Sequence, residues 1–165
     1  MKCGYISTNY CLHKDKKAIY PAYKIIEKGG KKIAFIGVAT PQTLSKTSLV
    51  TIRDENGEPV YDFLTENHSQ ELFERVQQQI DIVKSEGADY VIIVAHLGID
   101  GDALEENTSR GLLNNLNGVD ALIDGHTHLI YERTTKGKDN KDVLFAQTGT
   151  KLNVIGVLLY IQMDQ

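Results

Sequence analysis

The spacing of apolar residues predicts that strands come first in this chain and that helices and strands then alternate. Residues 23–28 and 31–38 are two strand-like runs separated by Gly29 and Gly30. Because both glycines tolerate positive φ, the pattern predicts a β-hairpin, and the nearly continuous apolar character of the second run predicts an interior strand. Residues 42–66 show no clear period and are expected to form a surface excursion.

A change of period at Ser69 predicts an amphipathic helix. From there apolar residues recur every three to four positions, at Leu72, Phe73, Val76, Ile80 and Val83. Ser69 can cap the start of this helix, and Gly87 stands where a left-handed residue ends it.

Four further short apolar runs and one short helix follow. Strands are predicted at residues 89–96, 119–123, 143–146 and 154–161, and a helix at residues 109–116. A helix followed by a buried strand is half of a βαβ unit. The chain is therefore predicted to be α/β, with a mixed sheet that carries antiparallel additions.

The composition is that of one ordinary globular domain. The chain has 165 residues, of which 41% are hydrophobic and 24% are charged, and its formal net charge is −4. The mild acidity argues against a nucleic-acid surface, and no apolar run is long enough for a membrane span or a signal peptide. Cys3 and Cys11 are too few for a disulfide framework. These features leave the localisation open.

Two of the predicted strands end at histidines. His96 closes one strand, and His126 and His128 follow the next. In open α/β sheets, ligands bind at the carboxyl ends of the strands. A single histidine after a strand is usually an ordinary turn residue, but these three together predict a site for a metal such as Zn, Fe, Mn or Ni.

Other candidate sites are weaker. His13 stands among charged residues and is expected in a solvated loop, and His68 is expected to have a local role at the entry of the helix. The acidic stretch 100–106 lacks the register of a calcium loop and is expected to be plain surface. The sequence contains no nucleophile elbow, Walker loop or dinucleotide fingerprint.

Eight short segments, taken in their order along the chain, resemble one known family. They are YPAYKII (20–26), GKKIAFIG (30–37), ATPQT (39–43), AHLG (95–98), TSR (108–110), IDGHTH (123–128), QTG (147–149) and NVIGV (153–157). Each segment alone is unspecific. The ordered set resembles the calcineurin-like metallophosphoesterase superfamily, in its branch of 5′-nucleotidases and cyclic-nucleotide phosphodiesterases.

The resemblance implies a four-layer αββα sandwich with two divalent metals, such as Zn, Mn or Fe, at the sheet edges. It implies that His96 and His126 bind the second metal, that His128 binds the first, and that Asp124 supports the site without being a direct ligand. The family's early Asp-x-His motif, bridging Asp and Gly-Asn-His motif would lie ahead of residue 1. Residues 1–165 are thus expected to be a partial catalytic domain that lacks its catalytic histidine and its carboxy-terminal nucleotide-specificity domain.

By this resemblance, the intact protein is a metal-dependent phosphoester hydrolase that acts on nucleotides, of the 5′-nucleotidase or 2′,3′-cyclic-nucleotide phosphodiesterase type. The isolated chain is expected to be nearly inactive and to associate with itself through an uncovered sheet face or edge. The alternative is a non-catalytic fragment or assembly module with an incomplete metal site. The family is mostly exported or at the cell surface.

The IDGHTH segment also resembles the His-x-His motif of barrel amidohydrolases. That motif ends the first strand of a barrel of about 250 residues. Only 37 residues follow His128, so the chain is too short for this alternative.

Overall fold

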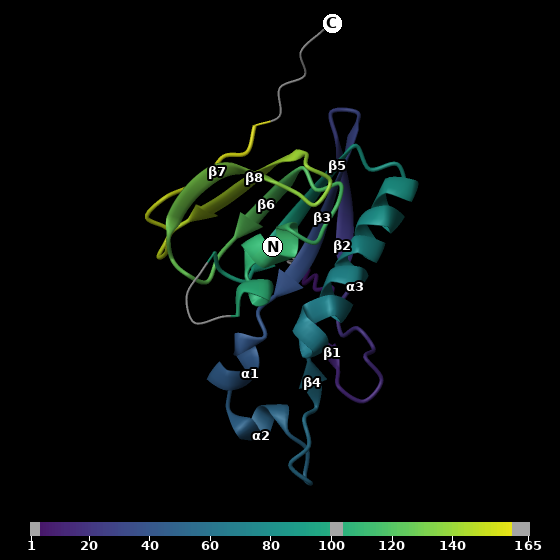
Figure 1. The fold of residues 1–165 in the computed structure, drawn as a ribbon, viewed down its shortest axis with the longest axis vertical. Helices are drawn as coiled ribbons and strands as arrows, with labels where there is room; N and C mark the ends of the chain where they lie inside the picture. The colour runs from purple at the N-terminus through teal and green to yellow at the C-terminus, as the bar shows by residue number, and fades with distance from the viewer. Residues whose placement is uncertain (1–3, 100–103, 160–165) are drawn as a thin grey trace, which may run out of the picture.

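The computed structural model describes residues 4–99 and 104–159, and its centre is a six-stranded mixed sheet (Figure 1). In spatial order the strands are β2 (Tyr23–Lys28), β3 (Lys31–Ala39), β5 (Tyr90–His96), β6 (Ala121–Asp124), β8 (Asp142–Thr148) and β7 (Ile130–Lys136). The four central strands run parallel, and β2 and β7 run antiparallel at the two edges. The predicted α/β class with a mixed sheet is confirmed.

The predicted hairpin is also confirmed. Strands β2 and β3 pair in antiparallel register, with Lys28 opposite Lys31. Gly29 and Gly30 lie between them at φ values of +59° and +72°, where a side chain would be strained. This hairpin places β3 beside β5, and the chain leaves β3 at the same edge of the sheet at which β5 and β6 end.

The long helix α3 (Glu66–Ser85) buries the predicted apolar residues Leu72, Phe73, Val76, Ile80 and Val83. Its end is as expected, because Gly87 has a φ of +86° and its N–H donates to the carbonyl of Lys84. The predicted cap is wrong. Ser69 lies at a φ of +60°, and its hydroxyl donates to Asn107 Oδ1 in η1 (Glu105–Asn107).

The core lies between one face of the sheet and the helices α3 and α4 (Ser109–Leu113). Alternate strand residues such as Ile36, Ile93 and Leu122 are completely buried there. Burial of one such side chain contributes about 1.5–3 kcal/mol. The opposite face is less covered, and Val94 on it is 40% exposed.

Two features of the second half of the chain differ from the prediction. Strand β7 was not expected, because its sequence IYERTTK is mostly polar and lies at an edge where five of its seven residues are exposed. The strand predicted at 154–161 is wrong over its described part. Residues 154–159 form no strand, and Ile155 is 84% exposed; residues 160–161 lie outside the described residues.

Smaller elements complete the fold. The predicted excursion 42–66 contains α1 (Gln42–Lys46), α2 (Leu49–Ile52) and β4 (Tyr61–Asp62), and β4 pairs with β1 (Cys11–Leu12). The helix predicted at 109–116 is shorter, since α4 ends at Leu113. No helix of the described part of the chain combines the length and apolar character that crossing a bilayer takes.

Candidate metal centre

Parallel neighbours β5 and β6 bring His96 and His126 together. His96 is the last residue of β5, and His126 follows the end of β6 by two residues. The centroids of the two imidazole rings are 5.2 Å apart, and the ring planes meet edge to face at 70°. The sheet topology thus produces the juxtaposition, because the carboxyl ends of parallel strands lie at one edge.

The buried carboxylate of Asp124 ties the ends of these two strands to each other. Its Oδ1 accepts hydrogen bonds from the backbone N–H groups of Leu97 (3.0 Å), Gly98 (3.3 Å) and Gly125 (2.7 Å). Its Oδ2 is buried and has no hydrogen-bond partner among the described residues. A buried carboxylate oxygen without a partner is costly, and a cation at this edge would offset that cost. The supporting role expected for Asp124 stays a prediction.

The loop after β6 adopts a backbone that side chains rarely take. His126 and His128 have φ values of +82° and +59°. Such conformations cost about 1–3 kcal/mol each and persist only where the surrounding structure fixes them. Gln147 of β8 supplies that constraint. Its Oε1 accepts from Thr127 Oγ1 and from Leu129 N–H, each at 2.9 Å, and its amide donates to the carbonyl of Gly125.

Both Gln147 and Gln42 hold this loop in place, and sequence reasoning missed them. Gln147 is 2% exposed, and Gln42 Oε1 lies 2.8 Å from His126 Nε2. Gln147 belongs to the QTG segment, and its position at the end of a strand beside β6 was the available signal.

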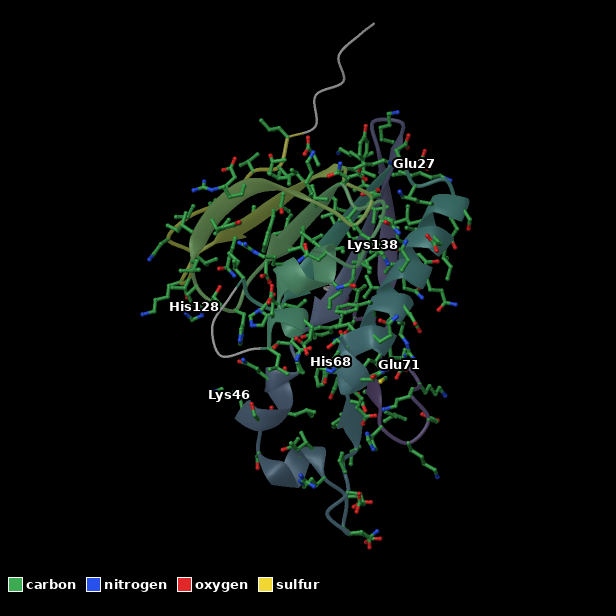
Figure 2. All side chains as sticks on the ribbon, viewed as in Figure 1. Glu27, Lys46, His68, Glu71, His128 and Lys138 are labelled. Carbon is green, nitrogen blue, oxygen red and sulfur yellow. The ribbon has the colours of Figure 1, made fainter. Side chains whose placement is uncertain are left out.

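The electrostatics of the site favour a neutral His96. Burial of the ring lowers the pKa of His96, the nearby His126 and His128 lower it as well, and Asp124 offsets only part of this. A neutral imidazole is the form that binds metals. His128 is exposed and lies on the same loop as His126, at the end of the sheet nearer α1 (Figure 2).

Away from this edge, another group of side chains places possible metal-binding atoms within 4.8 Å of one another: His13, Asp62 and Glu66. The Lys16 ammonium already pairs with Asp62 Oδ2, and His13 Nδ1 lies 2.9 Å from the same oxygen. Burial raises the pKa of Asp62, but the hydrogen bonds from Lys16, the Leu64 N–H and His13 outweigh it and hold the pKa below its usual value. His13 lies in a turn and its side chain is 39% exposed, so the expected solvated loop is confirmed, and its ring also contacts the buried Asp62.

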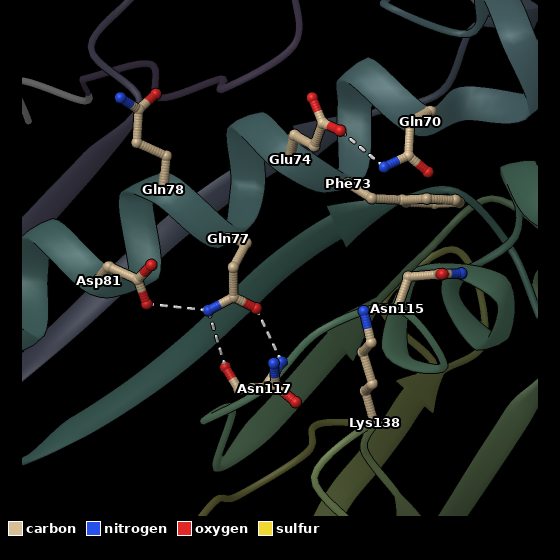
Figure 3. Close-up of a pocket in the computed structure, with 9 residues that line it drawn as sticks. All are labelled: Gln70, Phe73, Glu74, Gln77, Gln78, Asp81, Asn115, Asn117 and Lys138. Carbon is tan, nitrogen blue, oxygen red and sulfur yellow. Dashed lines mark hydrogen bonds between the residues drawn. The ribbon is translucent and has the colours of Figure 1, made fainter.

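A pocket of about 320 Å³ lies between α3 and the residues that follow α4 (Figure 3). Its lining is rich in side-chain amides that bond to carboxylates and backbone groups. Gln77 Nε2 donates to Asp81 Oδ1, and Gln77 Oε1 accepts from the Asn117 N–H. None of the lining residues is a histidine or cysteine, so the candidate chemistry stays at the edge of the sheet.

Replacement of Gly125 by alanine is expected to displace the His96 imidazole. The added Cβ would lie 2.9 Å from His96 Nδ1 and 3.4 Å from its Cε1. Because Gly125 does not have a positive φ, the effect arises from this contact alone. The His96 ring resonances should move in ¹H–¹⁵N spectra, and the free energy of unfolding should fall by about 1–3 kcal/mol.

The control for this substitution is Gly4→Ala, because a Cβ at Gly4 has no neighbour within 4 Å. Unchanged His96 resonances in Gly125→Ala, or equal changes in both variants, would contradict the described packing of the ring.

Comparison with known proteins supports the fold described above. A 2′,3′-cyclic-nucleotide 2′-phosphodiesterase/3′-nucleotidase of Salmonella typhimurium is 26% identical over 158 residues, covering 86% of this chain but 21% of its own length. The structure of a 5′-nucleotidase precursor from Thermus thermophilus matches 87% of this chain and 27% of its own, with 22% identity and a TM-score of 0.62.

The structure of a sulfate thiohydrolase, SoxB, from the same organism matches 88% of this chain and 23% of its own, with 21% identity and a TM-score of 0.64. The fold is thus shared by proteins whose names state different substrates. The family model of the calcineurin-like phosphoesterases matches residues 6–129, and members of that family are metal-dependent. The chain spans about a fifth of the length of its Salmonella relative, and it belongs to the calcineurin-like phosphoesterase family.

Proposed function

We propose that this chain contributes part of the metal centre of a phosphoester hydrolase that acts on nucleotides. The observation that carries the proposal is the pair of imidazoles, His96 and His126, with ring centroids 5.2 Å apart at the carboxyl edge of parallel strands. The unpartnered Asp124 Oδ2 beside the end of β6 supports a cation there. The donor set suits Zn, Mn or Fe.

In this proposal His96 and His126 hold one divalent metal and His128 holds the other. Such ions, when bound there, would supply the positive charge that polarises a phosphate group and lowers the pKa of a water molecule. The role of this chain is to present the imidazoles. Asp124 keeps His96 and His126 in place by accepting hydrogen bonds from the backbone N–H groups of the residues next to them. Only a neutral imidazole binds a metal, so protonation in acid competes with metal binding, and the lowered pKa of His96 favours its binding form.

The described donors are too few for two ions. Three imidazoles bring no negative charge, and no carboxylate of the described residues bridges them to hold two dications close together. Guided by the family resemblance, we propose that the anionic ligands and the catalytic histidine come from residues outside these 165. If they do not, the chain is the alternative, a non-catalytic module with an incomplete metal site.

We infer the substrate class from the names of the similar proteins. The name of the Salmonella relative states activity on 2′,3′-cyclic nucleotides and 3′-nucleotides, and that of the Thermus structure a 5′-nucleotidase. Nucleotides are thus the shared substrate class, and the position of the phosphate differs between the two. A panel of 5′-, 3′- and 2′,3′-cyclic nucleotides covers both.

The first test of this proposal is metal binding by the metal-free chain. Titration with Co²⁺ or Zn²⁺, followed by absorption spectroscopy and calorimetry, should show binding that His126→Ala weakens by at least about 10–100-fold. His68→Ala is the matched control, because the His68 side chain is 88% exposed and pairs with Glu106 rather than with the other histidines. Equal losses in the two variants, or no binding by the unaltered chain, would refute the site.

The second test is turnover by the isolated chain. With Mn²⁺ or Co²⁺ present, hydrolysis of the nucleotide panel should be very slow, because each missing catalytic role costs about 10²–10⁴-fold. Rapid metal-dependent hydrolysis that is lost in His126→Ala would show that these 165 residues form a complete catalyst. That result would overturn the proposal that further ligands lie elsewhere.

We also propose that two copies of the isolated chain associate through the sheet face opposite α3. On this face Val94 and Ile123 are cross-strand neighbours, and a groove of about 350 Å³ runs between β6, β7, β8 and residues 154–158. Apolar side chains around the groove are exposed, including Ile130 at 73%. The sheet edges carry charged residues, such as Glu132 in β7, which disfavour pairing of edge strands.

Sedimentation at tens of micromolar tests this association. The unaltered chain should form a dimer or larger species, and Val94→Lys should shift it to the monomer, because a charge on the face opposes its burial. Leu104→Lys is the control, since Leu104 is also exposed (66%) but lies outside the sheet, directly ahead of η1. If the unaltered chain is monomeric at this concentration, the proposed self-association is wrong.

A further inference from the structure

The side chain of Gln42 reaches one of the candidate metal-binding residues from a distant part of the chain. Gln42 Oε1 lies 2.8 Å from His126 Nε2, across 84 positions of sequence. Gln42 begins α1, three residues after the end of β3, and β3 runs parallel to β5. The amide therefore arrives at the edge of the sheet where β5 and β6 end.

The backbone around Gln42 holds this amide in place. The Gln42 N–H donates to Thr40 Oγ1 (3.2 Å), and the Gln42 carbonyl accepts from the Ser45 hydroxyl (2.9 Å). Thr40 is buried, and the N–H of Thr43 donates to its carbonyl. The backbone of the residue is thus anchored on both sides of its Cα, so only side-chain rotamer freedom is lost when the amide points at the imidazole.

The chemistry of the contact determines which nitrogen of His126 carries the proton. The Gln42 amide is placed with its oxygen toward Nε2, and because an amide oxygen only accepts hydrogen bonds, Nε2 of His126 is the donor in this arrangement. A neutral imidazole has a single N–H, and its other nitrogen then keeps a free lone pair. The hydrogen bond made by one ring nitrogen decides which nitrogen binds a metal.

We propose that Gln42 is a positioning residue that fixes His126 as the Nε2–H tautomer and leaves Nδ1 as the nitrogen that binds the metal. This inference rests on the proposed function, because it assigns a ligand atom within the same site. It predicts that an acceptor at position 42 is required and that the rest of the glutamine side chain is not. Gln42→Glu keeps an acceptor of the same length, whereas Gln42→Leu removes it.

The test begins with the metal-free chain carrying ¹⁵N-labelled histidine. At a pH above the histidine range, long-range ¹H–¹⁵N correlation should show His126 protonated at Nε2, with a proton that exchanges slowly with solvent. Gln42→Leu should lose the slow exchange and give a mixture of tautomers, and Gln42→Glu should retain the Nε2–H form. The matched control is Gln78→Leu, an exposed glutamine of α3, which should leave the His126 signals unchanged.

A second readout is the affinity for Zn²⁺, measured by calorimetry with the same four proteins. Gln42→Leu should weaken binding by about 10–100-fold, the usual effect of losing a group that orients a metal-binding histidine. Gln42→Glu and Gln78→Leu should bind within a few-fold of the unaltered chain.

The outcomes separate this inference from the proposed function. Protonation of His126 at Nδ1, or identical tautomers in the unaltered chain and Gln42→Leu, would overturn the role of Gln42. Loss of the tautomer in Gln42→Leu without loss of Zn²⁺ affinity would overturn its role in positioning a metal ligand. Failure of the unaltered chain to bind Zn²⁺, with the tautomer as expected, would overturn the proposed function and leave the placement of the proton standing.

Discussion

The candidate centre depends on one oxygen atom, the buried Oδ1 of Asp124. It accepts the N–H groups of Leu97 and Gly98, which follow His96, and that of Gly125, which precedes His126. A hydrogen bond to a charged group contributes about 1.5–3 kcal/mol. The same carboxylate therefore fixes the backbone beside both imidazoles, and a shift of the end of β5 relative to β6 would break its bonds to Leu97 and Gly98.

Topology explains why so many polar groups meet at this edge. Gln42 follows β3, His96 ends β5, His126 follows β6 and Gln147 lies near the end of β8. These four strands are the parallel ones, so their carboxyl ends coincide. Residues separated by up to 84 positions thus become hydrogen-bond partners without any local motif. The strained backbone of His126 is stable because the ends of three different strands constrain its loop.

The sequence predicts those helices and strands whose apolar residues recur at a regular spacing or form an unbroken apolar stretch. Helix α3 and strand β5 follow from apolar spacing, and the position of His96 follows from the end of β5. Strand β7 is not predictable in this way, because an edge strand with both faces partly exposed has no apolar alternation. Residues 154–161 mislead in the opposite way, because their apolar sequence predicts a strand, yet the described residues 154–159 pair with no other strand. Gln42 and Gln147 escape prediction because their roles lie in contacts between distant segments.

The open face of the sheet and the incomplete donor set belong to the same strands. Val94 lies on the open face of β5, two residues before His96, and its cross-strand neighbour Ile123 lies three residues before His126. Any segment that buries this face therefore arrives next to the imidazoles. Such a segment gains apolar burial of about 25 cal/mol per Å², and it would be placed to bring carboxylates to the proposed metal site. If one segment did both, covering the face and completing the proposed site would be linked equilibria, and each would strengthen the other by the same free energy.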